Sequence, residues 1–237
     1  MMLVDLAGLL NELPQDATPR EYRQAIVEDN LLGKRTLSTR RSAAKLLPQL
    51  YALDARVPLF RALRYLWDKD PAGRPLIALS CAVARDPILR LTASSVLAAT
   101  PGEMVDKGEL AEAITRSVPG HFSTSTLATA ARNAASSWAQ GGLLQGHRLK
   151  QRVRPKATPG AVAYTLLLGY LSGASGQRLL NTFWIRLLDT PRDRITELAE
   201  QASARGWIVY RQAGEVVEVR FPALLTAEEE EARREPD

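Results

Sequence analysis

The sequence predicts a mainly α protein made of two helical lobes, of which the C-terminal one is winged-helix-like and ends in a β-hairpin. Three observations support this fold class. Apolar residues recur at helical spacing through most of the chain, for example at Ala43, Leu47 and Leu50. Prolines and capping residues divide that pattern into short helices. Close to the end of the chain, two runs rich in β-branched residues flank a glycine-containing turn, which is typical of a hairpin.

The N-terminal lobe is expected to span residues 1–118. Thr18 and Pro19 mark a helix start, with threonine as N-cap and proline at the first helical position, so we expect a helix from there to about Asp29. Ser38 or Thr39 is expected to cap the helix that follows. The prolines that separate further short helices are Pro58, Pro71, Pro75, Pro87 and Pro101.

The C-terminal lobe is expected over residues 119–225, because Pro119-Gly120 is the clearest break in the helical pattern. A polar segment at 123–126 caps an Ala-rich helix that continues through Trp138 and stops at Gly141-Gly142. After this helix, basic residues alternate with apolar ones, which indicates a short hairpin or an extended arm.

The last part of this lobe is predicted to contain a buried helix near 162–171 and a second helix from Asp193 to Arg205. The second helix leads directly into two strands, 207–211 and 216–221. A helix that runs into a two-stranded hairpin is the pattern of a winged helix. Residues 141–156 indicate a degenerate second copy of this helix-then-wing arrangement, although the sequence has no exact repeat period.

Charge is distributed unevenly along the chain. Residues 113–188 contain no Asp or Glu, although the chain has 26 acidic residues in 237, and nine Arg or Lys lie in this stretch. The cations are densest at 147–156, where nearly every second residue is positive. Such a surface favours a polyanionic partner, because each phosphate that is neutralised releases condensed counterions. The alternative interpretation is a solvated basic loop.

A second group of cations begins at Lys34 and is mixed with hydroxyl side chains at the start of a predicted helix. Hydroxyls and backbone amides at such a start can hold phosphate oxygens while arginines lie on both sides of them. The alternative is that Ser38 or Thr39 only caps the helix and that the arginines are solvated. The predicted DNA-binding residues of the two groups are Lys34, Arg35, Ser38, Thr39, Arg40, Arg41, Lys45, Arg148, Lys150, Arg152, Arg154 and Lys156.

The C-terminal tail, residues 226–237, has the opposite charge. It holds six acidic residues and two arginines, so residues 1–225 carry a net charge of +9 while the whole chain carries +5. We expect the tail to be a solvated helix end or a disordered segment. The alternative is a tail that folds over the basic surface as a phosphate mimic.

Residue usage also predicts the compartment. Cys81 is the sole cysteine, so no internal disulfide can form and a reducing, cytoplasmic location is expected. The N-terminus lacks the basic segment of a secretory signal. The longest charge-free run, residues 157–177, is interrupted by glycines and a proline, so we expect a buried helix there rather than a membrane span.

Sequence motifs of enzymes are missing. The chain has neither the GxxxxGK[ST] loop of nucleotide hydrolases nor a GxSxG nucleophile, and two histidines with one cysteine are too few for a zinc site or a Cys-His nucleophile. The carboxylates that could bind a nuclease metal lie beside prolines and helix starts, where capping explains them better. We therefore expect a non-catalytic protein without a metal or cofactor. Those carboxylates are Asp68, Asp70, Asp106 and Glu109.

Several segments resemble the BrxA family, small components of BREX bacteriophage-exclusion systems. The resemblance covers roughly residues 15–222. It is carried by Asn30-Leu31-Leu32-Gly33-Lys34-Arg35, Ser38-Thr39-Arg40-Arg41, Ser125-Thr126, Gly142-Leu143-Leu144, Gly206-Trp207-Ile208 and Gly214-Glu215-Val216, of which the first is the most specific. The resemblance implies a mostly helical, two-lobed, non-catalytic DNA-binding protein that acts in phage defence beside a methyltransferase, an ATPase and a phosphatase-like component.

The sequence leaves three kinds of partner open. The first is double-stranded DNA, held mainly through its backbone, with other BREX components as neighbours. The second is an acidic protein docked on a non-catalytic scaffold in a defence complex. The third is RNA, although only Trp138, His147 and Tyr164 lie near the basic run, too few for a platform on which bases stack.

The terminal winged helix is expected to be structural or partner-binding. Acids such as Glu197 and Glu218 accompany its arginines, and carboxylates would repel phosphates. Trp207 and Phe221 are expected to pack inward. The arginines that would otherwise be candidate contacts are Arg192, Arg194, Arg205 and Arg211.

Overall fold

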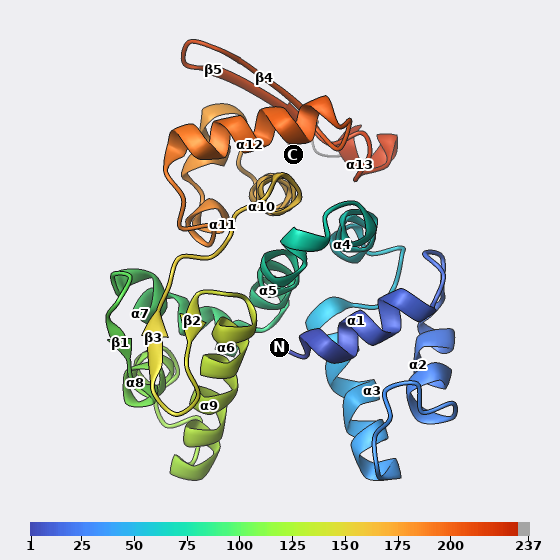
Figure 1. The fold of residues 1–237 in the computed structure, drawn as a ribbon, viewed down its shortest axis with the longest axis vertical. Helices are drawn as coiled ribbons and strands as arrows, with labels where there is room; N and C mark the ends of the chain where they lie inside the picture. The colour runs from blue at the N-terminus through green and yellow to red at the C-terminus, as the bar shows by residue number, and fades with distance from the viewer. Residues whose placement is uncertain (232–237) are drawn as a thin grey trace. The chain divides into compact units, whose positions relative to one another are not determined.

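The computed structural model describes residues 1–231 and is mainly α-helical, with a small antiparallel hairpin near the C-terminus (Figure 1). It divides into two compact units. Unit 1 combines Met1–Asp54 with Ala78–Pro155, and unit 2 combines Ala55–Ile77 with the chain from Lys156 onward. Each unit is therefore built from segments that are distant in the sequence.

These units differ from the predicted lobes 1–118 and 119–225. Pro119-Gly120 lies inside unit 1, between two helices that pack against each other, α8 and α9. The proline and glycine do end a helix there, but the end of a helix does not determine which helix packs beside it. The proline and glycine therefore predicted the position of a turn correctly, but they did not predict the boundary between the two units.

The first part of unit 1 is helical. Its helices are α1 (Leu3–Glu12), α2 (Pro19–Val27) and α3 (Leu37–Tyr51), and α5 (Arg74–Arg85) contributes residues to both units. The helix predicted at Pro19 is confirmed, because Thr18 and Glu21 form a capping box in which each side chain accepts a hydrogen bond from the other residue's backbone amide. The fully buried Leu6, Leu9 and Leu47 belong to the core of this unit.

The second part of unit 1 adds a small sheet. In chain order it contains α6 (Pro87–Leu91), α7 (Ala93–Ala98), β1 (Met104–Val105), α8 (Lys107–Ser117), α9 (Thr124–Gln140), β2 (Leu144–Gln145) and β3 (Lys150–Arg152). The three strands are antiparallel in the order β1-β3-β2, with Val105 opposite Lys150 and Leu144 opposite Arg152. The predicted basic hairpin is thus confirmed as β2 and β3, and β3 also pairs with the distant β1.

Unit 2 is arranged around one buried helix, α10 (Pro159–Leu171), in which every residue from Gly160 to Gly169 is buried. This confirms the buried helix predicted in the charge-free run. Around it lie α4 (Pro58–Lys69), η1 (Pro71–Gly73), η2 (Gly176–Asn181), α11 (Phe183–Arg186) and α12 (Arg192–Ala204). Asp70 joins two segments of the unit, since its carboxylate accepts hydrogen bonds from the amides of Gly73 and Gly160 at 3.2 and 2.8 Å.

The chain continues after α12 into the predicted hairpin, β4 (Val209–Ala213) and β5 (Val216–Arg220). Trp207 and Phe221 are 7% and 0% exposed, which confirms that they pack inward. Of the acidic tail, residues 227–231 form α13 (Ala227–Glu231), and residues 232–237 lie outside the described residues. No helix within residues 1–231 is long and apolar enough to cross a membrane.

Candidate nucleic-acid interface

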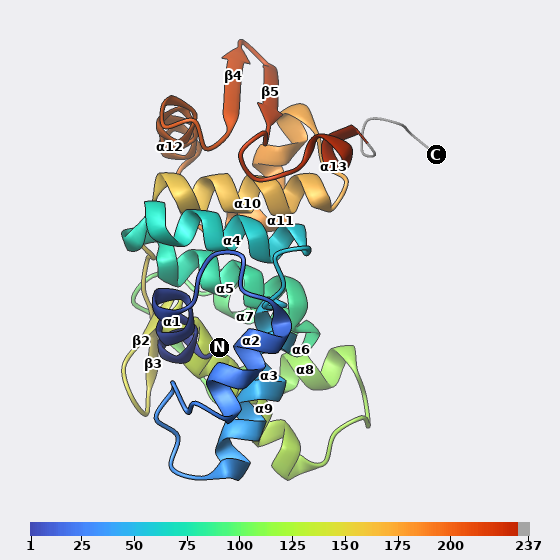
Figure 2. The ribbon, with the colours of Figure 1, turned by 90° about the vertical axis from the view of Figure 1, so that its right-hand side faces the viewer.

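Unit 1 brings two acid-free stretches of the chain into one compact body. Residues 30–53, which include α3, contain no Asp or Glu, and neither do residues 113–155, which include α9 and the β2-β3 hairpin. Both helices begin at the same end of unit 1, as the two views in Figures 1 and 2 agree. Leu46, Gln49 and Leu50 of α3 and Asn133 of α9 also line one open groove, together with Met2 and the segment Arg85-Asp86-Pro87.

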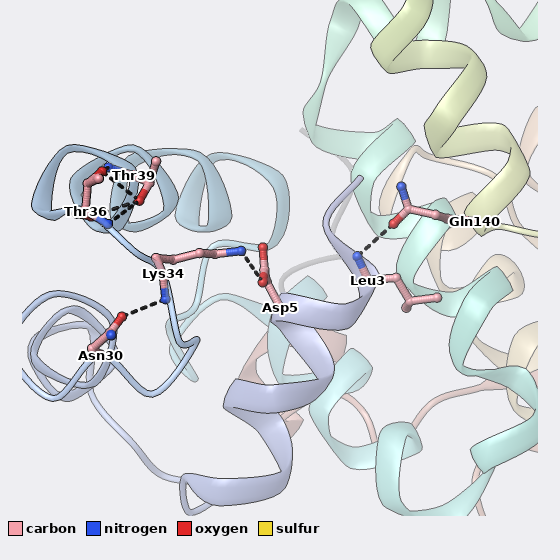
Figure 3. Close-up of polar contacts among 7 residues, drawn as sticks. All are labelled: Leu3, Asp5, Asn30, Lys34, Thr36, Thr39 and Gln140. Carbon is pink, nitrogen blue, oxygen red and sulfur yellow. Dashed lines mark hydrogen bonds and ion pairs between the residues drawn. The ribbon is translucent and has the colours of Figure 1, made fainter. Parts of the chain in front are cut away.

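The start of α3 is capped by Thr36, so the predicted cap at Ser38 or Thr39 is wrong (Figure 3). Thr36 has extended backbone angles and its hydroxyl accepts a hydrogen bond from the Thr39 amide, at 3.2 Å. Thr39 completes a capping box by accepting a hydrogen bond from the Thr36 amide. The helix begins at Leu37, two residues earlier than it would if Ser38 were the N-cap. Ser38 is an exposed residue of its first turn.

Lys34 is held in place before this helix. Its backbone amide donates a hydrogen bond to Oδ1 of Asn30 at 2.8 Å, and its Nζ lies 2.7 Å from Oδ1 of Asp5 on α1 (Figure 3). Both side chains of that ion pair are partly buried, with 30% of Lys34 and 16% of Asp5 exposed. Lys34 therefore joins the loop to α1 and is less available to a ligand than the sequence indicated.

The other cations of this group divide into one half-buried and three exposed side chains. Arg40 is half-buried and donates a hydrogen bond to the carbonyl of Val27, so it contributes to packing between α2 and α3. Arg35, Arg41 and Lys45 are exposed, and none of the three is paired with another residue among the described part of the chain. Arg41 and Lys45 lie one helical turn apart, on the same face of α3.

The basic hairpin presents two free arginines. Arg148 lies at the exposed tip between β2 and β3, and Arg154 is exposed just after β3. Lys150 is partly buried and its Nζ donates a hydrogen bond to the carbonyl of Gly146 at 2.6 Å. Gly146 has a φ of +97°, and a Cβ placed there would lie 2.4 Å from the carbonyl oxygen of Leu149, so the shape of the tip requires glycine.

Arg152 does not belong to the exposed surface, contrary to the prediction. It is 2% exposed, and its guanidinium donates hydrogen bonds to the backbone carbonyls of Val96, Leu143 and Val153. The physical reason is packing at the end of β3: Arg152 lies opposite the buried Leu144, and the carbonyls of Val96 and Leu143 lie within reach of its guanidinium. Its charge stabilises the connection between the sheet and α7 and is unavailable to a phosphate.

Lys156, the last residue of the predicted basic run, is exposed but belongs to unit 2. The run of cations at 147–156 is thus divided by the fold. Arg148 and Arg154 remain on the surface of unit 1, Lys150 is attached to the hairpin tip, and Arg152 is buried.

The exposed face of α9 (Thr124–Gln140) was not among the predicted binding residues. The buried side of this helix consists mainly of alanines and Trp138, whose Nε1 donates a hydrogen bond to Oγ1 of Thr92 at 2.8 Å. The opposite side is polar and carries one cation, Arg132, which donates a hydrogen bond to Oγ1 of Thr129 at 2.9 Å. The signal in the sequence was the amphipathic pattern of hydroxyls around an alanine stripe. The exposed residues are Thr124, Ser125, Thr126, Ala128, Thr129, Arg132, Asn133 and Ser136.

In unit 2, the arginines of the terminal helix and hairpin already have partners. Arg194 pairs with Glu197 at 2.6 Å and Arg211 lies 3.9 Å from Glu218. Arg192 donates a hydrogen bond to Oδ1 of Asn181 at 3.0 Å, and Arg205 stacks on the ring of Trp207. These contacts give each arginine a role within unit 2.

Comparisons with protein-family models, curated proteins and solved structures find no match for this chain. Among residues 1–231, no group of three His, Cys, Asp or Glu side chains is placed to hold a metal ion.

Proposed function

We propose that the protein is a non-catalytic DNA-binding accessory protein that holds double-stranded DNA mainly through its phosphate backbone. The observation that carries this proposal is the set of exposed, unpaired cations on the two acid-free segments of unit 1, residues 30–53 and 113–155. On α3 and the loop before it these are Arg35, Arg41 and Lys45, and on the hairpin segment Arg148 and Arg154.

The absence of acids from these two segments has an energetic consequence. A surface arginine beside a carboxylate gains little from the pair, and the pair has to be broken before a phosphate can take its place. The five unit 1 cations have no such pair, whereas Arg194 and Arg211 of unit 2 do. Phosphate binding at unit 1 therefore gains the full entropy of counterion release.

RNA is less well supported, because the aromatic side chains near the basic run are not available for stacking. Trp138 and Tyr164 are fully buried, which leaves His147 alone as an exposed ring. Sequence-specific RNA binding depends on bases that stack on exposed rings.

The resemblance to BrxA supplies the biological setting of the proposal: a BREX-type phage-defence system whose other components are the protein's neighbours. We further propose that α12 with the β4-β5 hairpin is winged-helix-like and serves unit 2 structurally or as a protein-binding element, since its cations are already engaged.

The test compares two triple variants with equal loss of charge. Arg41→Gln, Arg148→Gln and Arg154→Gln together remove unpaired cations from unit 1, and Arg194→Gln, Arg211→Gln and Arg220→Gln together remove paired cations from unit 2. Random-sequence duplex, single strands and RNA are titrated by fluorescence anisotropy at moderate salt.

We expect the unit 1 variant to lose at least about tenfold in duplex affinity, because three phosphate contacts are removed, and the unit 2 variant to bind like wild type. Equal losses in the two variants would show that net charge alone decides binding. Tighter binding to RNA or to single strands than to duplex would contradict the choice of ligand.

A further inference from the structure

The second part of unit 1 has the element order of a DNA-reading module. After the α6-α7 segment, the chain forms β1, α8, α9, β2 and β3, and the three strands lie in the order β1-β3-β2. This order of helix, strand, two helices and a two-stranded ribbon is that of a winged helix-turn-helix, in which the helix before the ribbon enters the major groove. The turn between α8 and α9, residues 118–123, is longer than the usual three or four residues.

Packing within the module fits this arrangement. α9 is held by its alanine side against α8, and Trp138 joins it to Thr92 between α6 and α7. At its end, Gly141 approaches Leu79 so closely that a Cβ would lie 2.4 Å from that side chain. The helix is therefore fixed on one side and at its C-terminal end, while its other side faces solvent.

The exposed side of α9 has the chemistry that base edges require. Asn133 carries a carboxamide, the group that pairs in bidentate fashion with adenine. The hydroxyl of Thr129 donates to the carbonyl of Ser125 at 3.0 Å and that of Thr126 lies 2.9 Å from Oγ of Ser123, and a hydroxyl oxygen has a second lone pair that can accept a hydrogen bond from a base. The Asn133 carboxamide has no hydrogen-bond partner among residues 1–231. α9 itself carries no carboxylate that would repel the phosphates bordering a groove, and Asp86, which lines the same groove as Asn133, is accompanied there by Arg85.

We propose that α9 lies in the major groove of duplex DNA and reads bases through Thr129, Asn133 and Arg132, while the tip between β2 and β3, residues 146–149, contacts the adjacent backbone as a wing. This inference rests on the proposed duplex binding and goes beyond it, because backbone contacts alone need no groove. It assigns sequence readout to a helix that carries none of the five unpaired cations and whose one cation is Arg132.

The first test fills the groove without changing the charge. Two duplexes of identical sequence are compared, one unmodified and one in which every cytosine carries a glucosyloxymethyl group at C5, which occupies the major groove. We expect wild-type affinity for the modified duplex to be at least about tenfold lower, because α9 can no longer enter. Equal affinity for the two duplexes would overturn the inference and leave the proposed function intact, whereas no binding to either would refute the proposed function as well.

The second test distinguishes base-specific contacts from contacts to the phosphate backbone. Thr129→Ala with Asn133→Ala removes uncharged groups from exposed helix positions where alanine is a better helix former, so folding is preserved. Wild type is expected to enrich defined sequences from a random duplex pool, and the double variant to lose about tenfold of that preference at an unchanged salt dependence. Gln201→Ala on α12 is the matched control and should keep the preference. A double variant that selects the same sequences as strongly as wild type would contradict the role of α9.

Discussion

Two arginines of the hairpin segment, Arg152 and Arg154, have different roles because one is buried and the other is exposed. Arg154 is exposed and unpaired, whereas Arg152 is enclosed and satisfies three backbone carbonyls. A guanidinium suits that position because its fixed fork of five donors can reach several acceptors at once without a proton to lose. The same residue type therefore serves stability at one position and is free for a ligand two residues later.

Replacing Arg152 with Met should lower the free energy of unfolding by about 3 kcal/mol, because the methionine leaves the carbonyl of Val96 buried without its guanidinium donor and removes one of the two hydrogen bonds to the carbonyl of Leu143. Arg154→Met should change it by less than about 0.5 kcal/mol. Urea denaturation followed by circular dichroism measures both. Equal stability of the two variants would contradict the buried role of Arg152.

A second prediction concerns the cap of α3. Thr36→Ala should destabilise the protein by about 1 kcal/mol, since the Thr39 amide loses its acceptor, while Ser38→Ala should be close to neutral. The two variants differ by two positions in the same exposed segment, so each is the control for the other in thermal unfolding. A larger loss in Ser38→Ala would place the cap where the sequence first indicated it.

At the scale of elements, the hairpin tip depends on one glycine. Gly146→Ala should reduce duplex affinity, because the added Cβ meets the Leu149 carbonyl and displaces the tip that carries Arg148. Gly214→Ala in the other hairpin is the control: its φ is also positive, but a Cβ there meets nothing within 4 Å. Anisotropy titrations of both variants with duplex DNA test this prediction. An equal change in affinity for the two variants would show that the tip between β2 and β3 does not contact the DNA.

Elements whose signals are local could be predicted from the sequence. The helix start at Thr18 and Pro19, the alanine-rich α9 and both hairpins depend on residues close together in the chain. The pairing of β1 with β3 could not be predicted, because a two-residue strand leaves almost no pattern. The cap of α3 was misplaced because three hydroxyl residues, Thr36, Ser38 and Thr39, compete for one position, and backbone angles rather than residue type select among them.

The candidate site was predictable in its charge and not in its geometry. The positions of the acidic residues along the chain were enough to locate both basic stretches, because they depend on the sequence alone. Whether a given cation is free depends on distant partners, as with Lys34 and Asp5 or Arg152 and Val96. The polar face of α9 could not be predicted as a binding site, because its residues are mostly uncharged. Their possible role follows only from the helices and strands that surround them in the fold.

At the scale of the whole molecule, each unit is assembled from two separated segments. A chain that begins at residue 119 should therefore fail to fold, because α9 loses α8 and α10 loses both α4 and Asp70. Circular dichroism with urea titration tests this expectation. A cooperative unfolding transition in the fragment would show that the predicted lobe, and not the observed unit, is the folding domain.

The most direct test of the central claim is the salt dependence of duplex binding by the wild-type protein and by the variant that combines Arg41→Gln, Arg148→Gln and Arg154→Gln. A plot of the logarithm of the association constant against that of salt concentration gives a slope of about −0.9 for each phosphate neutralised. We predict a steep slope for wild type and a slope shallower by about 3 for the variant, one unit for each cation removed. A wild-type slope near zero, or identical slopes for the two proteins, would contradict phosphate binding by the cations on the acid-free segments of unit 1.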